Sequence, residues 1–370
     1  MFLAFRELRY ARLRFLMIGA IITLIAWLVF LLSGLANGLA ADNAGALQRL
    51  PADHLVFQAD SRLLLQRSLL PLASVEQVKR VSGVADAAPL GQMMVAVRRD
   101  AGGEQLDAAL LAIDPGSFLA PAITSGRGLA GASANGVVVD EKLAQDGVAL
   151  GDTLLVQPAG QELTVVGFTS GQTYSHAPVI YLSLDRWRGL RFASPGASGG
   201  IVDPISAIAV RANDAAAGEI AGAVPGVEVV SRAVAVQQVP GYREESQTLL
   251  MIQGFLVVIA AFIIAAFFYI LTLQKTAQFG VLKVLGASTS FLARDLLGQV
   301  VLLTLVGIAL GAGLAFGVAA IMPRAIPFAL ASRLIGIYGV TLLAVALGGT
   351  LISLRRIATT DALSAIGRVD

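Results

Sequence analysis

The chain has 370 residues, 56% of them hydrophobic and only 14% charged, whereas soluble globular domains average about 25% charged residues. This composition, with a mean hydropathy of +0.75, excludes an ordinary water-soluble enzyme and indicates a membrane protein. Cysteine is absent, which excludes disulfides, thiolate metal sites and cysteine nucleophiles, and two histidines are too few for a multi-histidine metal site.

The N-terminal stretch FLAFRELRYARLRF mixes apolar side chains with four arginines. We predict that residues 1–14 form an amphipathic helix in the membrane interface, the alternative being that they are only the positive flank of the next segment. Residues 15–41 carry no charge. Because this apolar run is about twice as long as the apolar region of a secretory signal, we interpret it as a retained transmembrane helix.

Residues 42–245 differ in composition from the rest of the chain. They contain 21 acidic and 15 basic residues, a balance of −6, whereas the remainder has 4 acidic and 12 basic residues, a balance of +8. Short β-branched runs between Gly, Pro and Asp turns predict an α+β domain with strands at 93–97, 136–139, 153–156, 163–168, 179–182, 207–211 and 227–230. Helices are predicted at 75–81, 141–145 and 214–223, and Asp140 is expected to cap the second of them.

Both histidines, His54 and His176, fall in this outer segment, away from the predicted spans. Neither lies in a recognisable catalytic elbow such as G-x-S-x-G, so we expect no enzymatic site. His176 stands between Tyr174 and Tyr181. We interpret this group as a surface turn that leads into a strand, with a ligand-handling patch as the alternative.

Three more uncharged windows follow, at 246–274, 296–323 and 334–354. With residues 15–41, the four windows contain 27, 29, 28 and 21 residues in chain order. A helix needs about 20 apolar residues to cross the hydrocarbon core of a bilayer. We therefore predict four transmembrane helices, with the third covering 291–323 and a tail at 355–370.

Basic residues near the spans predict the orientation, because Lys and Arg are retained on the cytoplasmic side. Four arginines precede the first span, three basic residues separate the second span from the third, and three lie in the tail. Both termini are therefore predicted to be cytoplasmic, and residues 42–245 extracellular.

The predicted cytoplasmic loop at 275–290 carries several apolar residues, whose exposure to water would be unfavourable. Residues 274–288, QKTAQFGVLKVLGAS, predict a short helix with an apolar face. Such a face indicates burial against a partner, the alternative being packing on the membrane surface. We expect the contact to depend on Phe279, Val281, Leu282, Lys283, Leu285 and the helix-ending Gly286.

The chain cannot bind ATP through a P-loop. Its four lysines are Lys79, Lys142, Lys275 and Lys283, and none follows a glycine, as the motif G-x-x-x-x-G-K-[ST] requires. If ATP drives this protein, a separate subunit must bind the nucleotide.

The stretch QFGVLKVLGAS resembles the coupling loop of MacB/FtsX-type (type VII) ABC transporter permeases, in which a short helix docks into the ATPase. The order of the parts is also similar, from FRELRYARLRF through one span, a large outer domain and three spans to the tail ATTDALSAIG. Segments such as VSGVADAAPL and DEKLAQDGVALGDTLLVQPAGQELTVVGF look like that family's extracellular core domain. The resemblance implies four transmembrane helices, with an α+β extracellular domain inserted between helices 1 and 2 as residues 42–245.

Within the family, residues 241–288 and the early stretch LLSGLANGLA are most similar to the DevC/HrtB branch of haem-exporter permeases. This likeness implies a homodimer of non-catalytic permeases that binds two copies of a P-loop ABC ATPase. The assembly is expected to export haem from the bacterial plasma membrane, and no nucleic-acid partner is expected. Two alternatives remain open. One is an FtsX-like regulator that transmits ATP-driven motion to an extracellular hydrolase, and the other is an exporter of glycolipid or another amphiphile.

A haem cargo would need an apolar cleft, a cation for its propionates and an axial ligand such as His, Met or Tyr. Helical spacing at the outer mouth of the second span places Glu244 and Met251 on one face and favours Glu244 over Glu245 as cavity-facing. For Glu244 and Glu245, the alternative is that their side chains only extend to the membrane interface. For Ser33 and Asn37 on the first span, the alternative is that they only form hydrogen bonds between helices. The candidate haem-binding residues are Tyr242, Arg243, Glu244, Glu245, Met251, Ser33 and Asn37, with the iron held by Tyr242, Glu244, Glu245 or Met251.

Overall fold

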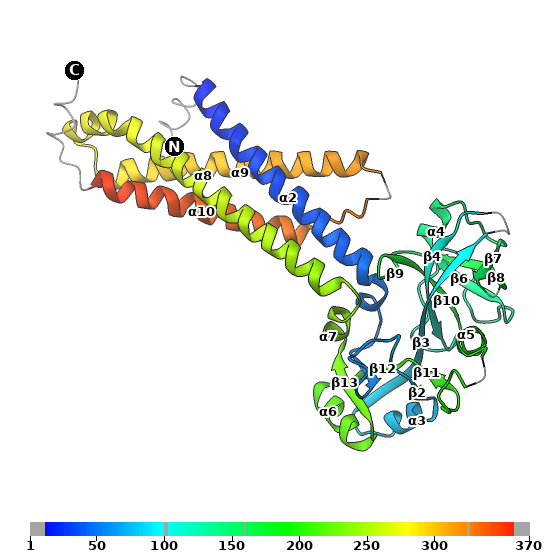
Figure 1. The fold of residues 1–370 in the computed structure, drawn as a ribbon. Coiled ribbons are helices and arrows are strands. Elements are labelled where there is room, and N and C mark those ends of the chain that lie inside the picture. The colour runs from blue at the N-terminus through cyan, green and yellow to red at the C-terminus, as the bar shows by residue number, and fades with distance from the viewer. Residues whose placement is uncertain (1–11, 100–102, 159, 195, 324–325, 359–370) are drawn as a thin grey trace. The chain divides into compact units, whose positions relative to one another are not determined.

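The computed structural model describes residues 12–99, 103–158, 160–194, 196–323 and 326–358 (Figure 1). The chain divides into two compact units: a helical unit of Met1–Leu39 with Gln247–Asp370, and an α+β unit of Ala40–Ser246. Most of the predicted interfacial helix at 1–14 and most of the tail at 355–370 lie outside the described residues.

Four long helices carry the apolar segments. Each contains a stretch long and apolar enough to cross a membrane: Phe15–Gln48, Tyr242–Gln274, Thr289–Ile321 and Ser332–Ile352. These stretches confirm the predicted fold class of four membrane helices with an α+β domain between the first and the second. The helices themselves are α2 (Arg12–Gln48), α8 (Tyr242–Val284), α9 (Thr289–Ile321) and α10 (Ser332–Ala358).

One face of each helix enters the core of the helical unit. On α8 the buried residues Ala260, Ile264 and Phe268 follow one another at intervals of four, as one stripe of a helix requires. They pack with similar stripes from α2, α9 and α10. The other side of α8, with Phe255 and Phe262, is exposed in the single chain.

The α+β unit is built on a large mixed sheet and a small two-stranded one. The strands of the large sheet are β1 (His54–Gln58), β3 (Val84–Arg98), β4 (Leu106–Ile113), β5 (Ser125–Gly126), β6 (Gly136–Asp140), β7 (Thr153–Gln157), β8 (Gln161–Thr169), β9 (Thr173–Tyr174), β10 (Ala177–Ser183), β12 (Ala207–Ala212) and β13 (Val227–Ser231). Their order is β13-β1-β12-β3-β4-β10-β6-β8-β5, with β7 paired to β3 and β8, and β9 paired to β10. The small sheet joins β2 (Leu70–Pro71) to β11 (Pro204–Ile205).

The two faces of the large sheet bury separate cores. The short helices around the sheet are α3 (Ala73–Lys79), α4 (Glu141–Gln145), α5 (Leu184–Arg191), α6 (Asp214–Ala223) and α7 (Arg232–Gln237). Along β4, Leu110 and Ala112 enter a core shared with α3, α4, α5 and α6, whereas Leu111 and Ile113 enter one shared with α7 and the end of α2. A strand buried on both faces needs no alternation of polar and apolar residues.

The seven strands and three helices predicted for this unit are all confirmed. The strands fall within β3, β6, β7, β8, β10, β12 and β13, and the helices correspond to α3, α4 and α6. Asp140 also caps α4 as predicted, since its side chain accepts a hydrogen bond from the backbone N–H of Lys142. The sequence did not predict β1, β4, α5 or α7.

Two helices run further than the predicted boundaries. The first span was predicted to end at residue 41, but α2 continues to Gln48 with a kink at Ala44, because Leu47 and Leu50 are buried in the core of the α+β unit. Residues 275–290 were predicted to form a loop with a separate short helix. Instead α8 runs unbroken to Val284, because nothing before Gly286 stops it.

Candidate functional site

The outer end of α8 carries four of the predicted haem-binding residues in its first turn. Glu244 and Glu245 stand where carboxylates favour a helix, because the N-terminal end of the helix dipole is positive. Arg243 and Glu244 are exposed, whereas Tyr242 and Glu245 are half-buried. The first turn therefore presents Arg243 and Glu244 outward.

Helical phase then separates the two glutamates. Glu244 and Met251 are both exposed and lie seven residues apart, which places them on one face of α8. The side chain of Glu245 lies off that face, where its Oε2 accepts a hydrogen bond from Asn43 Nδ2 at 2.9 Å. The preference for Glu244 over Glu245 is consistent with this geometry, and the binding of haem by either residue stays a prediction.

The expectation that both histidines lie away from the spans is wrong for His176. Its Nε2 is 3.3 Å from Glu245 Oε2, in the first turn of α8. His176 does belong to a turn that leads into β10, as predicted, but no local signal in the sequence shows that this turn meets the start of α8.

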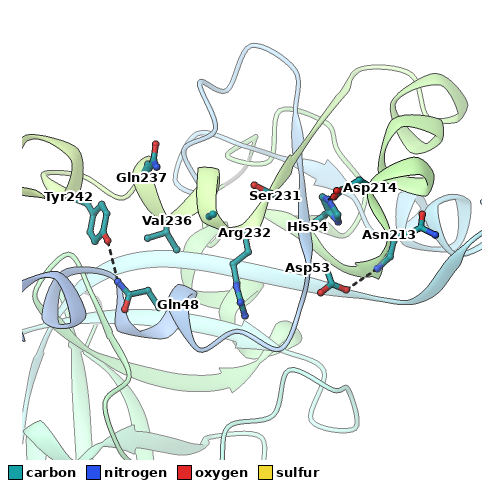
Figure 2. Close-up of a pocket in the computed structure, with 12 residues that line it drawn as sticks. Gln48, Asp53, His54, Asn213, Asp214, Ser231, Arg232, Val236, Gln237 and Tyr242 are labelled. Atoms are coloured by element: carbon teal, nitrogen blue, oxygen red, sulfur yellow. Dashed lines mark hydrogen bonds and ion pairs between the residues drawn. The ribbon is translucent and has the colours of Figure 1, made fainter. Parts of the chain in front are cut away.

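A hollow of about 730 Å³ opens in the α+β unit beside Tyr242 (Figure 2). The hydroxyl of Tyr242 accepts a hydrogen bond from Gln48 Nε2 at 3.4 Å, and the buried His54 pairs through Nε2 with Asp214 Oδ1 at 3.0 Å. The volume is within the range of small-molecule sites, about 300–1,000 Å³. The sequence did not predict this hollow, because residues far apart in the chain line it. They include Gln48, Asp53, His54, Asn213, Asp214, Ser231, Arg232, Val236, Gln237 and Tyr242.

On the first span, Ser33 and Asn37 already have partners within the helical unit. The hydroxyl of the buried Ser33 donates to the Val29 carbonyl at 2.6 Å, four residues earlier in α2. Asn37 Nδ2 donates to the carbonyl of Ala329 at 2.9 Å, in the connection between α9 and α10. Each of these bonds occupies one donor hydrogen of its side chain, and the predicted role of both residues in haem binding is untested.

The connection between α9 and α10 follows α2 closely. The backbone N–H of Ala329 donates to the Gly34 carbonyl at 2.9 Å. A Cβ at Gly34 would collide with the ring of Phe328, and a Cβ at Gly38 would collide with the backbone of Pro327. Small residues on this face of α2 therefore let the connection approach the helix backbone.

The predicted ATPase-coupling residues lie at the turn between α8 and α9. Gly286 has φ +94°, and Ala287 N donates to the Leu282 carbonyl at 2.9 Å, which is the glycine-based helix ending known as a Schellman motif. Ser288 then caps α9 by accepting from Phe291 N. The turn is therefore sharply defined by its own sequence.

The apolar side chains near this turn point in different directions. Leu282 is half-buried and packs with Ala287 and Leu292 of the same chain. Val281 and Leu285 are 55% and 76% exposed. The side chains of Phe279 and Lys283 lie outside the described part of the structure, so Val281 and Leu285 are the exposed apolar coupling candidates among the described side chains.

Among the described residues, no group of three or more His, Asp or Glu side chains is arranged to hold a metal ion.

Two family models match this chain. The model of the MacB-like periplasmic core domain matches residues 15–225, more than half of the chain. The model of the FtsX-like permease C-terminal region matches residues 250–362. Together the two matches leave residues 1–14, 226–249 and 363–370 uncovered.

Individual relatives point the same way. A protein of Staphylococcus haemolyticus strain JCSC1435, named as the hemin transport system permease HrtB, is 27% identical over 368 residues, 100% of this chain and 99% of its own. A protein of the same name from Staphylococcus epidermidis strain ATCC 12228 is 27% identical over 365 residues, 99% of each chain. The crystal structure of the periplasmic region of MacB from Actinobacillus actinomycetemcomitans matches 52% of this chain and 94% of that one at 15% identity, but its TM-score of 0.37 is too low to carry an argument.

Proposed function

We propose that this chain, which belongs to the family of ABC transporter permeases with a MacB-like core domain and an FtsX-like C-terminal region, exports haem from the membrane. The observation that supports haem is the full-length similarity to permeases named for hemin transport. In this proposal the chain moves the cargo and a separate P-loop subunit hydrolyses ATP, since no lysine of the sequence follows a glycine.

The assembly that we propose is a homodimer of this permease with two copies of the ATPase. Both termini would be cytoplasmic and the α+β unit extracellular, as the distribution of basic residues predicts. The ATPases would contact the turn between α8 and α9, where Val281 and Leu285 expose apolar surface beside Lys283 and Gly286.

For the cargo we propose the exposed face of α8. Met251 is a chemically suitable axial ligand for iron, and Glu244 lies two turns away on the same face. Arg243 supplies a cation for a propionate, and Tyr242 is a second candidate ligand. Glu245, Ser33 and Asn37 complete the proposed set, and each of them also makes one of the hydrogen bonds described above.

The visible spectrum of the purified permease after haem addition tests the cargo. We expect a sharp Soret band that weakens in Met251→Ala and in Glu244→Gln, because each change removes a group proposed to hold haem. Met17→Ala is the matched control, since Met17 on α2 is 57% exposed and Met251 is 59% exposed.

Two outcomes would contradict the haem proposal. A spectrum that stays that of free haem would remove haem as the cargo and leave an amphiphile exporter or an FtsX-like regulator as the alternatives. A Soret band lost equally in Met17→Ala and Met251→Ala would show that the α8 face is not the site.

A further inference from the structure

The turn between β9 and β10 holds two residues in an unfavourable backbone conformation. Tyr174 pairs with Ala177, which leaves Ser175 and His176 as a two-residue loop. Their φ angles are +51° and +65°, a combination that such loops normally assign to Asn-Gly because side chains meet steric resistance there. Backbone strain of this kind persists only where the surrounding contacts maintain it, and it marks the turn as a candidate functional element.

The ring presented by this turn lies between two carboxylates from two different helices. His176 Nδ1 is 3.3 Å from Oδ2 of Asp42, which belongs to α2. His176 Nε2 is 3.3 Å from Oε2 of Glu245, which belongs to α8. Both carboxylate side chains are less than one-fifth exposed, whereas the His176 side chain is 47% exposed.

Two more side chains complete the network. The fully buried Asn43 donates through Nδ2 to Glu245, and its backbone carbonyl accepts from Ser175 N at 2.6 Å. Lys142, at the start of α4, donates to Asp42 Oδ1 at 2.7 Å and to the His176 carbonyl at 3.2 Å. Backbone and side chains of the turn are therefore bonded to both helices and to α4.

The network lies close in sequence to the boundaries between the two units. All its members lie within Ala40–Ser246, next to the two points where the chain passes into the helical unit. Asp42 and Asn43 directly precede the kink of α2 at Ala44, and Glu245 is in the first turn of α8. The network therefore joins the parts of α2 and α8 that lie within the α+β unit to the β9–β10 turn.

We propose that Asp42, Asn43, Lys142, His176 and Glu245 form a latch that fixes α2 and α8 to the β9–β10 turn, so that the two helices move the α+β unit as one body. His176 is a positioning residue in this proposal, because it acts through the two helices and not on the cargo. The proposal rests on the permease function but is independent of haem as the cargo.

The test uses the full chain assembled with its ATPase in lipid nanodiscs. Because the chain has no cysteine, Val202→Cys and Ile321→Cys give two unique labelling sites, 76% and 82% exposed, in the α+β and helical units. Pulsed electron paramagnetic resonance then measures the distance distribution between the labels, after dilution with unlabelled chain. We expect His176→Ala to broaden this distribution and to reduce its ATP-driven shift, while the permease still stimulates ATP hydrolysis.

Two further variants separate a latch from a general fold contact. His176→Asn tolerates a positive φ and keeps an amide that can donate to Asp42, so it should give a narrower distribution than His176→Ala, which a misfolded unit would not show. Glu76→Gln, which breaks the surface pair of Glu76 with Lys79 in α3, should leave the distribution unchanged.

Transport supplies the last measurement. Coupling between two sites commonly amounts to about fivefold or more, so cargo moved per ATP in proteoliposomes loaded with haem should fall by at least about fivefold in His176→Ala. If the parent chain moves no haem, the cargo proposal fails while the label distances still test the latch. A distance distribution and an ATP-driven shift in His176→Ala equal to those of the parent would overturn the latch.

Discussion

Asp140 shows how one buried carboxyl links the local structure of the outer domain to pH. Its Oδ1 accepts from Lys142 N at 3.0 Å and its Oδ2 from Gln172 N at 2.6 Å. Burial nevertheless raises the pKa of Asp140 above its ordinary value of 3.8, and the two backbone hydrogen bonds only partly oppose this. A carboxyl with a raised pKa holds its proton more tightly in the folded chain than in the unfolded chain.

The sign of the pH effect follows from linkage. The contribution of Asp140 to stability is complete below its unfolded pKa and is lost as the pH rises from 3.8 through the raised folded value. The side chain of Asp140→Asn cannot ionise, so the stability of this variant should not fall with pH for this reason. The variant loses one hydrogen-bond acceptor, which generally lowers the free energy of unfolding by about 0.5–1.5 kcal/mol. We expect the difference in unfolding temperature between the parent and Asp140→Asn to narrow as the pH rises from acidic to neutral.

Circular dichroism of the purified protein during heating, at a series of pH values, measures this difference. Asp185→Asn is the control, because its side chain is 94% exposed and also stands in the first turn of a short helix. A difference that widens toward neutral pH would contradict the assignment.

Helix α9 carries two pairs of glycines spaced four residues apart, Gly307 with Gly311 and Gly313 with Gly317, and the two pairs have different surroundings. A Cβ added at Gly311 would lie 2.8 Å from Ala26 Cβ and 2.8 Å from the backbone nitrogen of Trp27 in α2. A Cβ at Gly317 would meet no atom of the described chain within 4 Å. The first pair, Gly307 with Gly311, therefore lets α2 and α9 approach each other, as small residues do in membrane helices.

This contrast gives a matched pair of substitutions on one helix. Gly311→Ala should destabilise the helical unit by about 1–3 kcal/mol, because the new methyl meets backbone that cannot move aside. Gly317→Ala should be neutral or stabilising by up to about 1 kcal/mol, since alanine favours the helix more than glycine does. The apparent melting temperature in detergent measures both, and equal temperatures for the two variants would show that the α2–α9 approach is not tight.

At the level of the assembly, the proposed transport takes its energy from a separate ATPase subunit. The proposed input is the exposed apolar surface of Val281 and Leu285 at the turn between α8 and α9. Val281→Glu should reduce stimulation of the partner ATPase by about tenfold or more, because a charge in the centre of an apolar contact commonly removes 2 kcal/mol of binding or more.

Steady-state ATP hydrolysis with reconstituted permease measures the effect of Val281→Glu. Thr289→Glu is the control, since it adds the same charge nearby but in the first turn of α9, where a carboxylate favours the helix. Undiminished stimulation in Val281→Glu would place the ATPase contact elsewhere.

Features that depend on composition and local period follow from the amino-acid sequence alone. Uncharged windows identified all four membrane helices, because a charge is costly in hydrocarbon wherever it occurs. Alternating β-branched runs identified seven strands of the outer domain, and Asp140 and Gly286 identified a helix start and a helix end.

Elements and contacts that depend on distant partners follow only from the folded structure. β4, with the sequence LDAALLAI, has no alternation because both of its faces are buried, so no local pattern distinguishes it from a helix. The end of α2 and the hollow beside Tyr242 are likewise formed by residues far apart in the chain. His176 meets Glu245 across a separation of 69 positions, and only the folding of the large sheet brings the β9–β10 turn to the start of α8.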